Sequence, residues 1–143
     1  MLATIACAWR WLGVQPVSLS AENSFGNVIF GDVAGQYWRI CPEELSCSVI
    51  ANDEAGLQRL WLDDEFVRDW QMKIPLGIAE DVLGIPSDGR CYCLKIPGPL
   101  GGNYTAENFG FICRKELISF AGEVARQIDS LPNGAKIRLR VVD

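Results

Sequence analysis

The stretch that most constrains the fold of this chain is a Pro/Gly-rich loop between two strand-like runs. Residues 91–96 (CYCLKI) place successive side chains on opposite faces, as a β-strand requires. The Pro-Gly-Pro run at 97–99 ends that strand, because proline lacks the ladder donor and fixes φ at about −65°. Gly101-Gly102 allows positive φ twice in succession, and an apolar extended run begins again at Phe109. This order predicts a long hairpin with a shaped loop, which on these residues alone is an ordinary hairpin.

Three further strand candidates precede the hairpin. The first two flank the Gly/Asp-containing turn 31–35, and the third alternates apolar and polar side chains. Their ranges are 28–30, 36–40 and 45–51. At the other end of the chain, Ile137, Leu139 and Val141 alternate with basic residues, which predicts a half-exposed edge strand.

Helical spacing, with apolar residues three and four apart, fills most of the remaining chain. Residues 1–13 predict a short helix that packs on one edge of the core, closed by Gly13 and followed by an extended lead-in through residue 24. The longest helical pattern runs from Arg114 to Asp129.

A helical insertion separates the first strands from the hairpin. Asn52 or Asp53 can cap its first helix, and residues 63–65 (DDE) resemble the start of a second one. We expect Pro75 to end or kink that second helix, with a third short helix closed by Gly84.

Together these elements predict a single α+β domain spanning 1–143, mainly an antiparallel sheet packed against several helices. The apolar content of 49% and the charged content of 22% suit one well-formed globular core. Residues 1–24 form the short helix and lead-in of this domain. No repeat or linker divides the chain.

The N-terminal and cysteine patterns favour a cytoplasmic protein. The apolar start lacks a basic region and is interrupted by Arg10, and no run approaches the ~20 apolar residues of a membrane span. The six cysteines contain no Cys-x-x-Cys and accompany no histidine, so buried free thiols are favoured over a zinc site drawn from scattered ligands. We therefore expect no metal and no cofactor.

The charge distribution points to a basic partner. The net charge is −5, which argues against direct nucleic-acid binding, since phosphate recognition needs clustered Lys and Arg. Residues 41–89 carry eleven acidic and three basic residues, a net charge of −8. Such a surface steers encounters with a basic protein, although a solvated acidic helical face would show the same composition.

The sequence gives little support for a set of catalytic residues. Without histidine neither a Ser-His-Asp nor a Cys-His arrangement can form. The carboxylate pairs mostly fall at expected helix starts, where they stabilise the helix dipole. We therefore expect a binding protein and not an enzyme.

Three ordered blocks of sequence resemble the type VI secretion immunity-protein family, and together they span about residues 25–137. The hairpin loop matches the pattern P-x-x-L-G-G-x-Y-x-x-E-N through Pro97, Leu100, Gly101, Gly102, Tyr104, Glu107 and Asn108. Residues 27–42 resemble the family's strand–turn–strand with its Tyr-Trp pair, and residues 120–137 its closing helix. Longer relatives carry an extra N-terminal domain, and we expect residues 1–24 to take no role borrowed from it.

The resemblance implies a protein that binds a cognate secreted antibacterial toxin, here a basic nuclease, and masks its active site. We expect two binding patches, chosen mainly on charge: Asp53, Glu54, Trp61, Asp63, Asp64, Glu65 and Asp69, and then Tyr104, Glu107 and Asn108. The alternative is a non-catalytic protein- or peptide-binding module of the broader cell-wall-regulator-like superfamily, with no part in toxin neutralisation.

Overall fold

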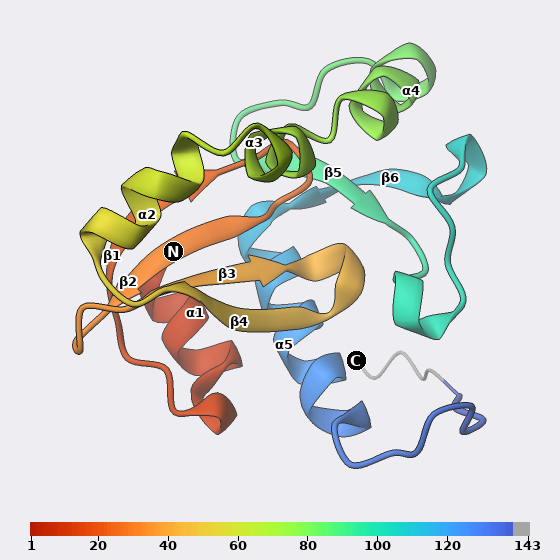
Figure 1. Ribbon diagram of the computed structural model, residues 1–143. Coiled ribbons are helices and arrows are strands. Elements are labelled where there is room, and N and C mark those ends of the chain that lie inside the picture. The colour runs from red at the N-terminus through yellow and green to blue at the C-terminus, as the bar shows by residue number, and fades with distance from the viewer. Residues whose placement is uncertain (139–143) are drawn as a thin grey trace.

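The computed structural model describes residues 1–138 and has an α+β fold built on two antiparallel sheets (Figure 1). The helices are α1 (Leu2–Ala8), α2 (Glu54–Trp61), α3 (Asp64–Gln71), α4 (Lys73–Leu83) and α5 (Arg114–Ile128). The strands are β1 (Pro16–Glu22), β2 (Val28–Asp32), β3 (Tyr37–Cys41), β4 (Ser46–Ala51), β5 (Arg90–Leu94) and β6 (Phe109–Cys113). Short 3₁₀ turns are η1 (Arg10–Leu12), η2 (Pro42–Glu44), η3 (Gly98–Leu100) and η4 (Ala106–Asn108).

The larger sheet has the strand order β1-β2-β3-β4, and helices cover both of its faces (Figure 1). Val28, Phe30 and Ile40 lie on one face and pack against α1 and α5. Ile29 lies on the other face and packs against Leu57 of α2 and Trp70 of α3. Alternation along β2 therefore supplies a separate core to each helical layer.

The smaller sheet is the predicted hairpin, with Leu94 paired to Phe109. Strand β5 is buried on both faces from Cys91 to Leu94, where every residue is apolar or uncharged. Cys91 and Cys93 pack against Leu117 of α5. Tyr92 and Leu94 pack on the opposite face with Phe25 and the α4 layer.

The loop between β5 and β6 is fixed by backbone geometry and by one amide side chain. Gly101 has φ = 98°, and Gly102 lies so close to the Ile96 carbonyl that a Cβ at residue 102 would overlap its oxygen. The Asn108 side chain accepts from Ile96 N at 2.9 Å and donates to the carbonyls of Ile96 and Asn103, both at 2.9 Å. The two glycines are thus needed for different reasons. Gly101 adopts a positive φ, whereas Gly102 leaves room for the Ile96 carbonyl.

The elements with strong local signals were predicted correctly. The predicted N-terminal helix is shorter than expected, since α1 ends at Ala8 and the turn η1 follows it, but Gly13 closes η1 in the left-handed region. Asp53 and Asp63 accept hydrogen bonds as the N-caps of α2 and α3. The long C-terminal helix ends at Ile128, one residue from the prediction. In the described residues no helix is both long and apolar enough to cross a membrane.

Four local predictions need correction or extension. Pro75 does not end α3; it lies in the first turn of α4, where a proline is tolerated, and Met72 ends α3 with φ = 48°. Leu45 is not a strand residue but closes η2 in the left-handed region. The lead-in through residue 24 contains an edge strand, β1, that was not predicted. Residues 136–138 of the predicted C-terminal strand are not extended into a sheet, and the rest lies outside the described residues.

We expect alanine at Gly102 to destabilise the fold more than alanine at Gly101. A Cβ at residue 102 meets a backbone carbonyl that cannot move without opening the hairpin, so the cost should be about 2 kcal/mol or more. At Gly101 the cost is φ strain alone, about 1 kcal/mol. Urea denaturation measures both.

Gly77→Ala is the matched control, because Gly77 lies in α4 with nothing within 4 Å of its Cβ position. Alanine there should raise helix propensity and leave stability equal or higher by up to about 1 kcal/mol. Equal unfolding midpoints for all three variants would show that the loop imposes no backbone constraint.

Candidate functional site

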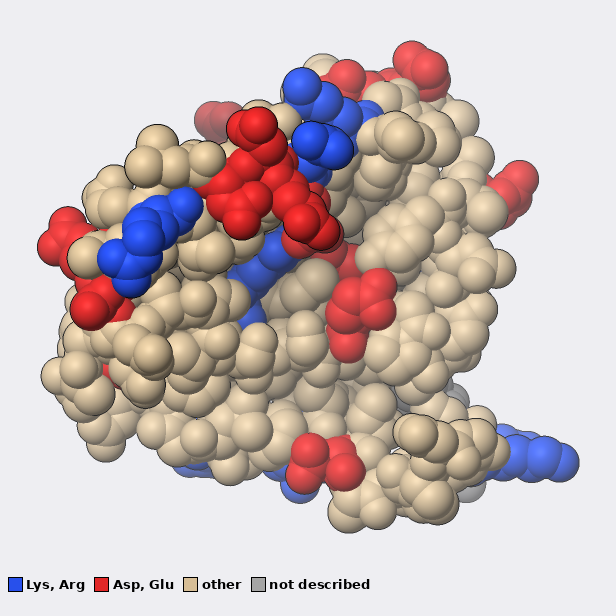
Figure 2. Space-filling model, viewed as in Figure 1, with Lys and Arg blue, Asp and Glu red and all other residues tan. Residues whose placement is uncertain are grey.

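A groove of about 830 Å³ opens between the larger sheet, the α3–α4 turn and the β5–β6 loop. Figure 2 shows a hollow on this face, with acidic side chains gathered over α3 beside it and more of them within it. The residues that line the groove are Arg39, Cys41, Glu43, Glu44, Ser46, Ser48, Ile50, Arg68, Asp69, Met72, Lys73, Ile74, Pro75 and Tyr104.

Strand register builds the floor of this groove. Arg39 pairs with Ser48 and Cys41 with Ser46, so these four side chains share one face of the sheet. The same face is covered by α2 and α3 further along, where Ile29 packs against Trp70. The groove is therefore the part of this face that the helical layer does not cover.

A series of hydrogen bonds between polar side chains lies beneath the groove. Asn27 is fully buried, and its amide nitrogen donates to both carboxylate oxygens of Glu43, at 3.0 and 2.9 Å. The Asn27 amide oxygen accepts from Arg39 Nε at 3.0 Å and from Nη2 at 2.8 Å. The uncharged Asn27 side chain thus lies between the Arg39 guanidinium and the Glu43 carboxylate. It supplies part of the hydrogen bonding that each of these groups needs.

Arg39 is further fixed at its exposed edge. Its Nη1 forms an ion pair with Asp69 Oδ2 at 2.6 Å, and its guanidinium carbon lies 5.2 Å from the Trp70 ring centre. The Arg39 side chain is only 13% exposed, whereas that of Asp69 is 69% exposed. Strand β3 and helix α3 are thereby joined by a charge pair at the groove wall.

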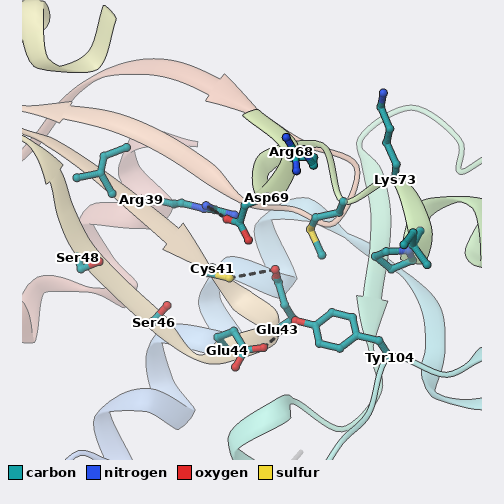
Figure 3. Close-up of a pocket in the computed structure, with 14 residues that line it drawn as sticks. Arg39, Cys41, Glu43, Glu44, Ser46, Ser48, Arg68, Asp69, Lys73 and Tyr104 are labelled. Atoms are coloured by element: carbon teal, nitrogen blue, oxygen red, sulfur yellow. Dashed lines mark hydrogen bonds and ion pairs between the residues drawn. The ribbon is translucent and has the colours of Figure 1, made fainter. Parts of the chain in front are cut away.

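Two carboxylates and a phenol form the opposite end of the groove. Glu43 and Glu44 come from η2, and Tyr104 OH donates to Glu44 Oε1 at 2.7 Å (Figure 3). Burial raises the pKa of Tyr104, and the hydrogen bond to Glu44 adds to the shift. Burial also raises the pKa of the Glu43 carboxyl, against the lowering effect of its hydrogen bonds from Cys41 and Asn27. We call Glu43, Glu44 and Tyr104 the acidic end of the groove.

Cys41 lies beside this end, with its thiol donating to Glu43 Oε1 at 3.0 Å. Burial raises the pKa of the Cys41 thiol, and the neighbouring Glu43 raises it further. The thiol therefore stays protonated near neutral pH and is a poor nucleophile.

The structure brings together two of the sequence-predicted site residues. Asp69 and Tyr104 come from different predicted patches and line the same groove. Glu107 is exposed in η4, and Asn108 is engaged by loop carbonyls, so neither lines it.

The remaining predicted residues belong to the α2–α3 layer. Trp61 packs its ring against Phe66 and Trp70, with ring centres 5.2 and 5.6 Å away, and is part of a core cluster. The acidic members are exposed in the first turns of the two helices or cap them: Asp53, Glu54, Asp63, Asp64 and Glu65.

Sequence reasoning missed the groove's central residues, Asn27, Arg39 and Glu43. A usable signal was present, because Arg39 is the one charged residue in the otherwise apolar and aromatic run Tyr37–Cys41. A charge at such a position needs a buried partner. The Glu43-Glu44 pair was grouped with the carboxylate pairs expected mostly at helix starts, whereas it lies in the short turn η2 and Glu43 is buried.

Within residues 1–138, no group of three or more His, Cys, Asp or Glu side chains is arranged to hold a metal ion. Neither the protein-family models nor the curated proteins contain a match to this sequence. The family resemblance therefore stays a prediction, and the groove carries the functional argument.

The raised pKa of Glu43 gives a pH-dependent stability. Below its ordinary value of 4.5 the carboxyl is protonated in both folded and unfolded chains. As pH rises above 4.5 the unfolded chain ionises first, so this residue lowers the free energy of unfolding until pH passes the raised folded pKa. Above the folded pKa both the folded and the unfolded chain are ionised at this residue, so the decrease in the free energy of unfolding no longer changes with pH.

Comparing the parent with Glu43→Gln isolates this effect, because the other titrating groups are common to both proteins. The unfolding free energy of the parent minus that of the variant should fall as pH rises above 4.5 and then level off. Urea denaturation at a series of pH values from 4 to 8 measures it, in the range about the Glu pKa. Parallel pH profiles would contradict the burial of a titrating Glu43.

Proposed function

We propose that this chain is a non-catalytic immunity protein that binds a cognate basic toxin, of the secreted nuclease kind, and masks its active site. The observation that carries the proposal is the groove in which Asp69 and Tyr104, from the two predicted patches, line one cavity. Its volume of about 830 Å³ lies within the range of sites that take a ligand or a protruding segment.

The surface around the groove suits a basic partner. Asp69 and Glu44 line it, the starts of α2 and α3 carry further exposed acidic residues, and residues 41–89 have a net charge of −8. A nuclease presents a basic surface to its phosphate substrate, so the same surface is attracted to this protein. The resemblance of the loop 97–108 to type VI immunity proteins supports the same partner class.

The side-chain chemistry favours binding over catalysis. The sequence has no histidine, and the Cys41 thiol is held protonated by burial and by Glu43. All six cysteines are free thiols, which suits a protein that acts in the reducing cytoplasm where a nuclease would meet DNA.

The decisive experiment is co-purification with the product of the neighbouring toxin gene, followed by a nuclease assay. We expect a stable complex and loss of toxin activity at equimolar immunity protein. Full toxin activity with this protein in molar excess would refute the proposal, and an isolated housekeeping locus would favour the peptide-binding module.

We expect the Asp64→Lys/Glu65→Lys variant to bind the toxin more slowly than the parent. Both residues are exposed in the first turn of α3 and form no ion pair in the described residues, so reversal should leave the fold intact. Asp69 is unsuitable for this test because it pairs with Arg39. Rim charges act mainly on association, so the association rate should fall about tenfold at low salt and the effect should shrink as salt rises.

Glu116→Lys is the control, since Glu116 is exposed in the first turn of α5. It changes charge at a comparable helix position outside the α2–α3 layer and should leave the association rate near that of the parent. Stopped-flow measurements at low and high salt compare the three proteins. Equal rates at both salts would place the interface away from α3.

A further inference from the structure

The acidic end of the groove forms no ion pair in the described residues. Glu43 is 5% exposed, and among residues 1–138 the side chains that donate to its carboxylate are those of Asn27 and Cys41. A buried carboxylate with one shared amide donor and a weak thiol donor keeps unused acceptor sites. Glu44 uses Oε1 to accept from Tyr104, with no second hydrogen-bond partner in the described residues.

The nearby basic residues do not neutralise this end. Three nitrogens of Arg39 are engaged by Asn27 and Asp69, on the side of the groove away from Glu44 (Figure 3). Lys73 extends away from Glu43 in the same view. Among residues 1–138 the only ion pairs within 4 Å are Arg39–Asp69 and Arg126–Glu123, so no cation in this range pairs with Glu43.

Part of the groove lining is apolar. Met72, Ile74 and Pro75, from the α3–α4 turn, line the same groove as Glu43, Glu44 and Tyr104. An apolar wall that leads to a carboxylate pair fits a long side chain with an aliphatic stem and a charged head.

We propose that the acidic end of the groove binds an arginine side chain of a partner protein. A guanidinium has five donors in a planar fork, enough to serve both Glu43 and Glu44, and its plane can stack on the Tyr104 ring. The stem lies along Ile74 and Pro75. The groove is larger than one side chain, so the arginine arrives on a protruding segment of a protein and the rest of the volume takes its neighbours.

This inference depends on the proposed function only for the identity of the partner, since a basic toxin would supply the arginine. The site itself is a property of the groove and can be tested with a small probe. N-acetyl-L-arginine amide carries the side chain and the flanking peptide groups. N-acetyl-L-citrulline amide has nearly the same shape without the charge.

The experiment follows backbone amide shifts of the ¹⁵N-labelled protein by NMR during titration with each probe. We expect saturable shifts at Glu43, Glu44 and Tyr104 with the arginine probe, with a dissociation constant in the millimolar range typical of a single side chain. The citrulline probe should cause no saturable shift at these residues. Glu43→Gln should weaken binding at least about tenfold, since it removes one charge-assisted partner.

Glu44→Gln is a second variant, and it keeps the test valid if Glu43→Gln does not fold. Glu44 is exposed, and its side chain is bonded only to Tyr104 in the described residues, so the fold should tolerate the change while arginine binding weakens through loss of one carboxylate. Glu107→Gln is the matched control, because Glu107 is a carboxylate on the same loop that does not line the groove. It should bind the arginine probe as the parent does.

Equal binding of both probes, unchanged binding by Glu43→Gln and Glu44→Gln, or shifts confined to α2 and α3 would each overturn the inference. The nuclease assay is scored separately. Arginine binding at Glu43 without toxin inhibition would keep the site and reject the immunity function. Toxin inhibition without arginine binding would keep the function and reject this site.

Discussion

The buried amide of Asn27 is the interaction on which the rest of this site depends. It separates a guanidinium from a carboxylate, donating to Glu43 and accepting from Arg39. Its own backbone is fixed by Asn23, whose side-chain oxygen accepts from Asn27 N at 3.0 Å. Asn23 also donates to the Trp70 carbonyl at the end of α3. One turn between β1 and β2 therefore positions β3, η2 and α3 together. Removal of the amide would leave the buried Glu43 carboxylate with the weak Cys41 thiol as its side-chain donor in the described residues, and would take from Arg39 the acceptor of its Nε and Nη2.

The Asn27 arrangement lowers the stability of the fold, and it gives the groove two ends of different charge. A direct Arg39–Glu43 ion pair would neutralise both charges, but the intervening amide turns the guanidinium towards Asp69 and leaves the carboxylate under-satisfied. Burial raises the pKa of Glu43 because its desolvation is only partly offset by hydrogen bonds. Proteins place such unfavourable groups where function needs them. The groove consequently has an Arg39–Asp69 ion pair on one side and, on the other, an acidic end that forms no ion pair in the described residues.

Sequence reasoning succeeded where the signal is local and failed where it depends on distant residues. The caps Asp53 and Asp63, the αL glycine at residue 13 and the hairpin follow from residue types within a few positions. Strand β1 was missed although residues 17–22 (VSLSAE) alternate apolar and polar side chains, because this run was interpreted only as an extended lead-in after Pro16. Asp69 and Tyr104 were chosen for charge and family pattern, whereas their meeting in one groove depends on the packing of α3 against β3. The sequence around Asn27 did not predict its buried position, because an asparagine that follows a glycine is typical of an exposed turn.

The opening of the groove is itself encoded by the α3–α4 turn. Met72 has a left-handed backbone, unusual for a residue with a side chain, and its side chain packs with the Tyr92 cluster. That turn ends the helical cover over the sheet and redirects the chain, so that Ile74 and Pro75 form a wall and not a lid. A straight continuation of α3 would extend its helical layer instead of turning away beside Arg39 and Cys41. The strain at Met72 thus keeps the face exposed, while packing beneath the β5–β6 hairpin holds the strained residue in place.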